Sequence, residues 1–360
     1  MSQTFKAIKY SKPSRGGFQL KTFTVPTKLQ DDELLIKVSY AGINPVDIIL
    51  YQYAEAFNVW GEEWGMGREF SGTVVATGSE MEFAQGDRIV ASTKSIKETQ
   101  SAVGQYIVIK RSGWVIAKLL DNVPADIGAS LPLSYMTAVD ILNVQPSITT
   151  TPDSKILVLG GGTMAGFYTL QLLKNVYNVH DIYSVQSTKT DKLYAEKFNF
   201  KVNSINYDTE TRPITEVTQE IITNTFHGEK FDMIIDTIGN SDFFADIGSF
   251  LKLNQNKSYV TIVGDSVSVY NNTFWQHAKL IWGSIYRKIT NKLFNPGYHY
   301  AYVMMNPTDE NLVSGVKYLS EGKIHGLIDS AYSIEKFEDA INKLASHNAK
   351  GKVIIDLEEK

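Results

Sequence analysis

Three glycines follow an apolar stretch near the middle of the 360-residue chain, in the segment LVLGGGTMAGFYTLQLLK. Gly160, Gly162 and Gly166 are spaced so that a strand can turn sharply into a helix whose free backbone amides face an anion. Gly160 suits the tight turn, and Gly166 allows the helix to pack closely on the strand. The pattern predicts a cradle for the phosphates of a dinucleotide, and a purely structural turn is the alternative.

The next predicted strand ends in SVQSTKTDK, where a dinucleotide site contacts the adenosine ribose. A site that prefers NAD usually carries an acid at this strand end, about twenty residues beyond the last glycine. This strand end has none, and Ser187, Lys189 and Lys192 instead offer hydroxyl and ammonium groups to an additional 2′-phosphate. NADPH is therefore the predicted cofactor. In the alternative interpretation the two lysines belong to the solvated first turn of a helix.

The elements that hold this cradle are expected to alternate between strand and helix. Strands are predicted at KILVLG, IYSVQS, VNSINY, FDMIIDTIG and SYVTIVG, and helices from about Met164 and near 190–199. This alternation is typical of a parallel sheet covered by helices on both faces. The first third is rich in β-branched and aromatic residues between glycine turns and predicts a β-rich domain. The chain ends with helices predicted near 310–320 and 334–345 and strands near SAYSI and KVIIDL.

Composition excludes several classes of function. The net charge of −4 argues against nucleic acid as a partner, because the chain lacks a basic excess. Without a single cysteine the chain has neither a disulfide nor a thiolate nucleophile. No apolar run approaches the roughly 18 residues that a transmembrane helix needs, so no membrane span is predicted. The start MSQTFKAIKY lacks the apolar core of a secretion signal, and we expect a cytoplasmic protein.

A series of motifs across nearly the whole chain carries a family resemblance. They are AGINPVD, GREFSGTVVATG, GDRIV, LPLSYMTAVDIL, the glycine turn, DTIG, GKIHGLID and AKGKVII, in that order. The chain resembles the medium-chain dehydrogenase/reductase superfamily, in its zinc-independent, quinone-oxidoreductase-like branch. The resemblance implies an α/β fold in which residues 1–130 and 309–360 form a GroES-like β-rich catalytic domain. Residues 131–308 then form an inserted, doubly wound Rossmann domain for the cofactor.

The chain departs from the zinc-dependent relatives at two ligand positions. Asn44 stands where those relatives have a cysteine, and Arg68 stands where they have a histidine. Catalytic zinc usually takes three nitrogen, sulfur or carboxylate ligands, and this chain has no histidine before His180. We therefore expect no metal site, and a metal-dependent alcohol dehydrogenase is the weakest of the functions considered.

A second departure lies inside the glycine turn. Similar reductases usually have glycine at the position of Thr163, and here Thr163 and Met164 both place side chains where the pyrophosphate approaches. An obstructed cradle would make the chain a catalytically silent, reductase-like protein that binds a partner or a lipid surface. This is the alternative to an enzyme.

A reductase without a metal is suited to an electron-poor acceptor, such as a quinone or an α,β-unsaturated ketone or aldehyde, because the developing charge falls on an oxygen that needs only hydrogen-bond donors. We expect a small apolar electrophile as substrate. Tyr51 and Tyr53 are the predicted proton donors or oxygen-binding groups, and simple packing is the alternative for both. The resemblance assigns Asn44 to the nicotinamide side of the cleft. It assigns further cofactor contacts to Thr137, Tyr207 and Gly264.

The segment between Asp265 and Asp309 contains cations and many aromatic residues but no acid. By resemblance this segment builds a substrate pocket or the contact of a homodimer. Plain packing is one alternative. Docking on an anionic lipid surface is the other, because aromatic residues beside cations are typical of interfacial helices.

Overall fold

The computed structural model describes residues 3–12, 16–57, 62–144, 150–254, 256–267, 274–294 and 296–358, without the side chains of 55–57 and 274–281. Two compact units divide the chain. Unit 1 comprises Met1–Met136, Asn306–Gly322 and Gly326–Lys360, and unit 2 comprises Thr137–Met305 and Lys323–His325. The predicted boundaries are at 130 and 309; the divisions at Met136 and Asn306 lie near them, whereas Lys323–His325 belong to unit 2 although they lie in the range predicted for the catalytic domain. Each unit is described by itself.

Unit 2 is built on a six-stranded parallel sheet in the order β11-β10-β9-β12-β13-β14. The strands are β9 (Lys155–Leu159), β10 (Asp181–Gln186), β11 (Asn203–Asn206), β12 (Met233–Asp236), β13 (Ser258–Thr261) and β14 (His299–Tyr302). The strand order reverses beside β9, and in a doubly wound sheet this switch point is where ligands bind, at the carboxyl ends of the strands. The glycine turn follows β9 directly and therefore lies at the switch point.

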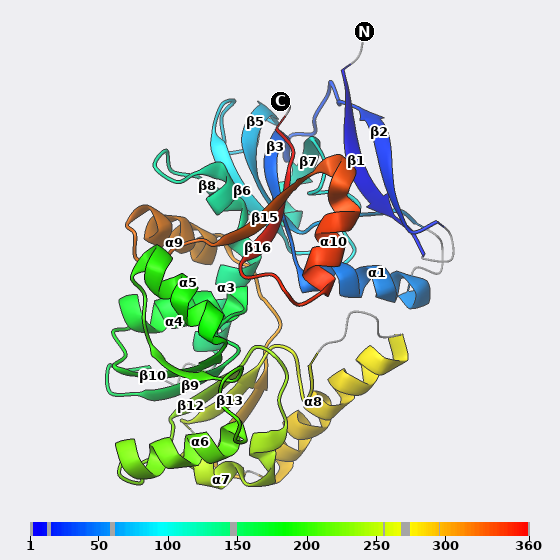
Figure 1. Cartoon of the computed structure of the whole chain (residues 1–360). Coiled ribbons are helices and arrows are strands. Elements are labelled where there is room, and N and C mark those ends of the chain that lie inside the picture. Colours follow the sequence, from blue (N-terminus) through cyan, green and yellow to red (C-terminus); the bar gives the residue numbers. More distant parts are fainter. Residues whose placement is uncertain are drawn as a thin grey trace. The chain divides into compact units, whose positions relative to one another are not determined.

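Helices cover both faces of this sheet, with α4 and α5 on one side and α6 and α7 on the other (Figure 1). They are α4 (Met164–Asn175), α5 (Thr188–Phe198), α6 (Ile214–Glu220) with a π-helical continuation Ile221–Thr225, and α7 (Ile247–Phe250), which follows a 3-10 turn at Asp242–Ala245. A longer helix, α8 (Phe274–Phe294), packs beside β14. The buried strand residues Leu157, Ile234 and Tyr259 form the centre of the core together with Phe231 and Phe243.

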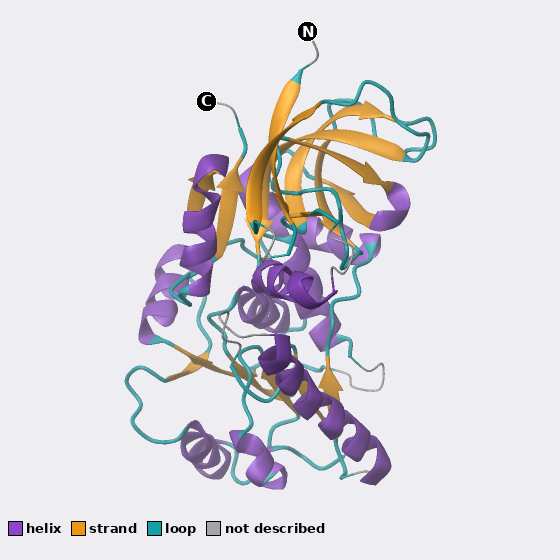
Figure 2. Cartoon of the chain, turned by 90° about the vertical axis from the view of Figure 1, so that its right-hand side faces the viewer, coloured by secondary structure: helices purple, strands orange, loops and turns teal. Residues whose placement is uncertain are grey.

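Unit 1 is β-rich, and its strands curve around one another (Figure 2). A seven-stranded sheet has the order β15-β16-β3-β5-β6-β8, with β7 paired to β3, and a three-stranded sheet has the order β2-β1-β4. The strands are β1 (Thr4–Tyr10), β2 (Phe18–Thr24), β3 (Glu33–Ile43), β4 (Trp64–Gly65), β5 (Glu69–Thr77), β6 (Arg88–Thr93), β7 (Tyr106–Lys110), β8 (Trp114–Lys118), β15 (Ile328–Ser333) and β16 (Lys352–Asp356). β16 pairs antiparallel with β3, so the end of the chain completes the sheet that its first third begins.

The helices of unit 1 are short. They are α1 (Pro45–Phe57), α2 (Ala125–Ala129), α9 (Asp309–Ser320) and α10 (Phe337–Ala345), with 3-10 turns at Arg111–Gly113 and Ile334–Lys336. A further helix, α3 (Pro132–Leu142), runs across the division between the units at Met136. None of the helices in the described part of the chain has the length and apolar composition needed to cross a bilayer. The predicted fold class, a β-rich domain combined with a doubly wound parallel sheet, is confirmed.

Candidate active site

The turn between β9 and α4 needs its glycines for steric reasons. Gly160 has a φ of +91°, a conformation that residues with a side chain rarely adopt. A Cβ on Gly166 would lie 2.3 Å from the carbonyl oxygen of Gly160, and a Cβ on Gly161 would lie 2.0 Å from Ser184 Oγ. Gly162 has more room, since its Cβ would come no closer than 3.2 Å, to Thr190 Oγ1. The turn is thus most tightly packed at Gly161 and Gly166 and less tightly at Gly162.

Thr163 turns its hydroxyl group back into the glycine turn. Its Oγ1 accepts a hydrogen bond from the amide of Gly166 at 3.0 Å, which makes Thr163 the N-cap of α4. The same oxygen lies 3.0 Å from the carbonyl oxygen of Gly160, to which it donates, and 2.9 Å from Thr237 Oγ1. Because the first intrahelical bond is made by the amide of Phe167, the amides of Met164 and Ala165 are the donors that this helix start leaves for an anion.

This geometry fits the phosphates of a dinucleotide. A phosphate needs a backbone that it can approach closely and a helix start with free amides. The polar side chain of Thr163 is turned back into the glycine turn. The Thr163 hydroxyl occupies one amide donor, that of Gly166, and its other contacts are to Gly160 O and Thr237 Oγ1. Gly160, Gly162, Thr163, Met164 and Gly166 thus form one continuous turn, and their contact with a cofactor stays a prediction.

The end of β10 holds cations and a carboxylate together. Lys189 and Lys192 are exposed at the start of α5, and no acid among the described residues forms an ion pair with either. Ser187 is buried and caps α5 through its hydroxyl, which accepts from the amide of Thr190. The Ser187 hydroxyl is therefore already used to cap α5. The two lysines remain the groups that an additional phosphate could reach.

The carboxylate comes from the end of the neighbouring strand. Asp208 Oδ1 accepts hydrogen bonds from the Thr188 amide at 2.8 Å and from Thr188 Oγ1 at 3.0 Å, at the first residue of α5. Asp208 follows Tyr207, whose exposed ring was a predicted cofactor contact and whose amide donates to Gln186 O at the end of β10. Residues 187–190, directly after β10, include no acid; Asp191 on α5 accepts from the side chains of Gln186 and Asn206, and the end of β11 supplies Asp208.

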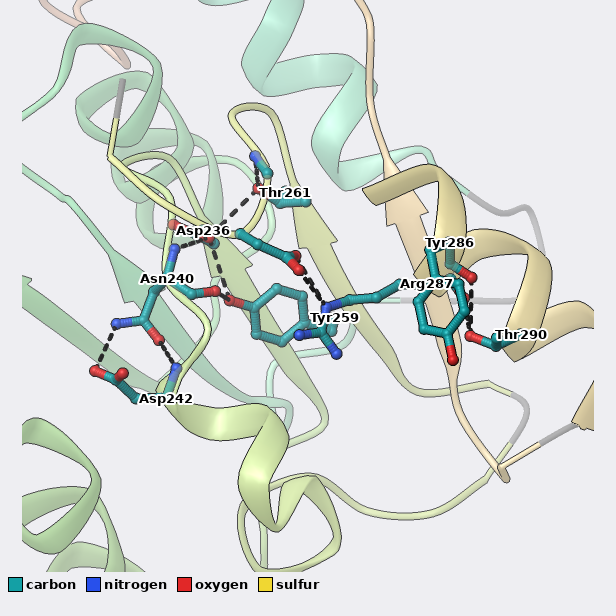
Figure 3. Close-up of polar contacts among 10 residues, drawn as sticks. Asp236, Asn240, Asp242, Tyr259, Thr261, Tyr286, Arg287 and Thr290 are labelled. Atoms are coloured by element: carbon teal, nitrogen blue, oxygen red, sulfur yellow. Dashed lines mark hydrogen bonds and ion pairs between the residues drawn. The ribbon is translucent and has the colours of Figure 1, made fainter. Parts of the chain in front are cut away.

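Asp236 organises the loops after β12 and β13. Its buried carboxylate accepts from the amides of Ile238, Gly239 and Asn240 at 3.0, 2.8 and 2.8 Å. Tyr259 also donates its hydroxyl to this carboxylate at 3.2 Å (Figure 3). Burial raises the pKa of Asp236 to about 6, and these hydrogen bonds limit the rise.

The same group of contacts extends to Gly264, another predicted cofactor contact. Thr261 Oγ1 lies 3.3 Å from the Asp236 carboxylate and accepts from the amide of Gly264 at 3.0 Å. Gly264 has a φ of +110°, so a side chain there would be strained. Two loops at the carboxyl edge of the sheet are therefore fixed by one buried acid.

Unit 1 contains a fully buried ion pair between Glu69 and Lys352, whose side chains are 0% and 2% exposed. Lys352 Nζ lies 2.5 Å from Glu69 Oε1 and donates to Asn44 Oδ1 at 2.6 Å and to Ser134 Oγ at 3.2 Å. Asn44 Nδ2 in turn donates to Glu69 Oε1 at 2.7 Å. The amide of Leu133, in the first turn of α3, donates to the other carboxylate oxygen at 2.6 Å. Every charged atom in this cluster has a partner, as a buried charge requires.

Asp47 extends this cluster from the first turn of α1. Its Oδ2 accepts from the backbone amide of Asn44 at 2.8 Å. Burial raises the pKa of Asp47 to about 7, although Arg68 lies close enough to oppose the rise. Arg68 is itself nearly buried and donates to the carbonyl oxygen of Ser95.

These residues do not fit a zinc ion. Zinc-dependent relatives have ligands at the positions of Asn44 and Arg68. The side-chain oxygen of Asn44 accepts a hydrogen bond from the Lys352 ammonium group, and Arg68 has a positively charged guanidinium. Lys352 supplies the positive charge beside Glu69. In the parts of the chain that the structure describes, no three His, Cys, Asp or Glu side chains are grouped to hold a metal.

The other predicted site residues lie on helices. Tyr51 on α1 stacks on Phe18 with ring centroids 4.1 Å apart and meets Tyr10 edge to face, so its ring has a packing role. Tyr53 lies on the same helix and is partly exposed. Thr137 is buried on α3. A part in proton transfer for the tyrosines, and a cofactor contact for Thr137, stay predictions.

Sequence reasoning gave no role to five acids or bases that the fold places in these clusters, namely Asp47, Glu69, Asp208, Asp236 and Lys352. Lys352 begins the strand KVIID, but charged residues such as Lys350 and Asp356 stand near it in the sequence, so its burial has no local signal. Asp208 follows Tyr207 directly in the chain, but its contact with Thr188 depends on the pairing of β10 with β11. Asp236 lies in the quoted motif DTIG, without an assigned role.

Two family models match the chain. Residues 30–117 match the alcohol dehydrogenase GroES-like domain, and residues 210–355 match the zinc-binding dehydrogenase model. Among curated proteins, Protein YIM1 of Candida glabrata is 28% identical over 366 residues and covers 96% of each chain. Protein YIM1 of Saccharomyces cerevisiae is 28% identical over 341 residues and covers 91% of each.

Solved structures show the same fold. The quinone oxidoreductase from Coxiella burnetii aligns with a TM-score of 0.72 and 18% identity, over 99% of this chain and 100% of its own. The human synaptic vesicle membrane protein VAT-1 homolog-like protein aligns with a TM-score of 0.70 and 19% identity, over the whole of both chains. The CurK enoyl reductase aligns with a TM-score of 0.71 and 17% identity, over 98% and 99%.

These matches show a GroES-like unit combined with a Rossmann-like unit, the fold of an oxidoreductase superfamily whose members bind a nicotinamide cofactor. The chain belongs to the medium-chain dehydrogenase/reductase superfamily.

Proposed function

We propose that the chain is a reductase of quinones or α,β-unsaturated carbonyl compounds that uses NADPH and no metal. The observation that carries this proposal is the buried cluster of Asn44, Glu69 and Lys352, which places an ammonium group and an amide where zinc-dependent relatives polarise a carbonyl. Without a Lewis acid, hydride transfer is easiest to an acceptor that is already electron-poor. Quinones and enones are such acceptors.

The chain's own residues supply binding and orientation in this mechanism. The turn at Gly160 and the start of α4 would hold the pyrophosphate of NADPH through backbone amides, and Lys189 and Lys192 would hold its 2′-phosphate. When bound, NADPH supplies the hydride. The acceptor oxygen then takes a proton, for which the hydroxyls of Tyr51 and Tyr53 are the proposed donors. The hydrogen bonds around Lys352 hold Asn44 in one orientation, which suits Asn44 to position the nicotinamide ring.

The activities named for structural neighbours support this substrate class. One neighbour is described as a quinone oxidoreductase, another as an enoyl reductase, and a third as a crotonyl-CoA carboxylase/reductase. The last two names describe reduction at a carbon–carbon double bond next to a carbonyl, which is the chemistry proposed for this chain.

Titration with NADPH, followed by protein fluorescence, tests the proposal first. Saturable binding, followed by oxidation of NADPH in the presence of a quinone or an enone, is the expected result. Tyr51→Phe and Tyr53→Phe should lower turnover without weakening NADPH binding if the tyrosines donate the proton. A chain that binds neither NADPH nor NADH would instead be a reductase-like protein without catalytic activity.

A further inference from the structure

Helix α8 turns its apolar side toward solvent. Trp282, Tyr286 and Leu293 are 66%, 69% and 70% exposed, and Ile285 and Ile289 between them are exposed as well. Their spacing of three or four residues places them on one face of the helix. We call these five residues the α8 stripe. An outward apolar stripe reverses the usual arrangement, in which such a stripe faces the core.

The opposite side of α8 is polar and faces unit 2. Ser284 is buried at 1% exposure. Arg287 extends from the helix toward the strand side and pairs with Asp265 at 2.8 Å (Figure 3). Asn291 Nδ2 donates to the carbonyl oxygen of Tyr298 at 3.0 Å, at the start of β14. These contacts hold the helix in place, while the residues of the α8 stripe are 37% to 70% exposed.

Positive charge borders the α8 stripe. Lys288 and Lys292 are exposed, each three residues after a stripe isoleucine, and no described acid pairs with them. The sequence from 266 to 308 contains four lysine or arginine residues and no acid, in a chain whose net charge is −4. The surface around the stripe is thus more basic than the chain as a whole.

We propose that α8 docks the protein on an anionic lipid surface. The stripe residues would enter the boundary between headgroups and acyl chains, where tryptophan and tyrosine side chains are favoured. Lys288 and Lys292 would contact the anionic headgroups. A helix of 21 residues is about 31 Å long and can lie flat on the surface, with its polar side still held by unit 2.

Charge favours lipid over the other occupants. A second copy of the chain that covered the stripe with its own α8 would bring two acid-free, basic segments together. A protein partner would have to match a stripe of large apolar and aromatic side chains bordered on one flank by cations. An anionic bilayer has an apolar interior for the stripe residues and negative headgroups beside it for the lysines. This inference does not depend on the proposed enzyme activity.

Vesicle flotation with the full chain tests the docking. The protein should float with phosphatidylcholine vesicles that contain phosphatidylserine, and should float much less with phosphatidylcholine alone. Lys288→Gln and Lys292→Gln should each reduce partitioning onto the anionic vesicles by about fivefold. Trp282→Ser and Leu293→Ser should reduce it further. Val313→Ser on α9 is the matched control, because Val313 is 53% exposed and lies outside the segment; it should leave flotation unchanged.

Two results would overturn this inference. One is a wild-type chain that stays unbound in the presence of anionic vesicles. The other is a dimer, seen by light scattering, that Trp282→Ser converts to a monomer while vesicle binding is unaffected, since a second copy would then cover the stripe. Circular dichroism of each variant shows that a loss of flotation is not a loss of folding.

Discussion

Two groups of lysines in this chain are held in opposite ways. Lys352 is buried in unit 1 and contacts a carboxylate, an amide and a hydroxyl. Lys189 and Lys192 are exposed at the start of α5 in unit 2, and no described acid pairs with them. A buried ammonium group has paid its desolvation cost and is fixed in place, whereas exposed ammonium groups keep their hydration and can bind an incoming anion. Lys352 is therefore suited to hold its neighbours in place, and Lys189 and Lys192 are suited to bind a ligand.

Removing the buried charge should have the largest effect. Lys352→Met leaves Glu69 buried without its counter-ion, and we expect the free energy of unfolding to fall by roughly 3 to 5 kcal/mol. Urea unfolding at neutral pH measures it. The double variant Lys352→Met with Glu69→Gln should recover a large part of the loss, because no unpaired charge remains. A single variant as stable as the wild type would show that the pair is not fully desolvated.

Asp47 tests the same buried region through pH. Its folded pKa of about 7 lies above the ordinary value near 4, so folding favours the protonated form. The stabilising contribution is present at pH 4 and is lost as the pH rises toward 7. Asp47→Asn cannot ionise, and we expect it to be more stable than the wild type at pH 8 by roughly 4 kcal/mol. Unfolding curves across this range measure the difference, and parallel pH profiles for the two proteins would contradict it.

The negative charge of Asp208 should weaken the attraction of Lys189 and Lys192 for the 2′-phosphate of NADPH. Its carboxylate holds the Thr188 donors and lies at the same helix start as the proposed 2′-phosphate site. Asp208→Asn keeps an acceptor oxygen for Thr188 but removes the charge, and should raise the ratio of NADPH to NADH affinity by about tenfold. Fluorescence titration with both cofactors measures the ratio. Glu196→Gln, an exposed acid on the outer part of α5, is the control and should leave the ratio unchanged.

The exposed lysines should each have a smaller effect. Lys189→Met and Lys192→Met should weaken NADPH binding by up to about fivefold each and leave NADH binding as it was, because an exposed ion pair contributes about 1 kcal/mol at most. Lys197→Met, in the last turn of α5, is the matched control. Equal losses for NADPH and NADH would show that the lysines do not distinguish the two cofactors.

The strands and helices of unit 2 could be predicted because their signals are local. The helix from Met164 begins where the glycine turn predicts, and KILVLG, IYSVQS and VNSINY are strands. The cluster around Lys352 could not be predicted in this way, because Asn44 and Lys352 are 308 residues apart and meet only when β16 pairs with β3. Short-range patterns contain no information about such a pairing.

Helix α8 shows a different limit of sequence analysis. Its large apolar residues recur at helical spacing, which normally indicates a face toward the core. Here the small and polar residues Ser284 and Asn291 face unit 2, and the apolar ones face outward. Periodicity identifies a face of a helix, but the direction in which that face points depends on the rest of the fold.

The buried Glu69–Lys352 pair of unit 1 and the exposed lysines of unit 2 should respond differently to salt. Mobile ions screen charges over a Debye length of about 8 Å at physiological ionic strength, but they act through water and cannot enter a site without solvent. The scaffold that holds Asn44 should therefore be insensitive to ionic strength. Any preference for NADPH that rests on Lys189 and Lys192 should instead decline as salt rises. The cell's ionic composition would then tune which cofactor is used and leave the geometry around Asn44 unchanged.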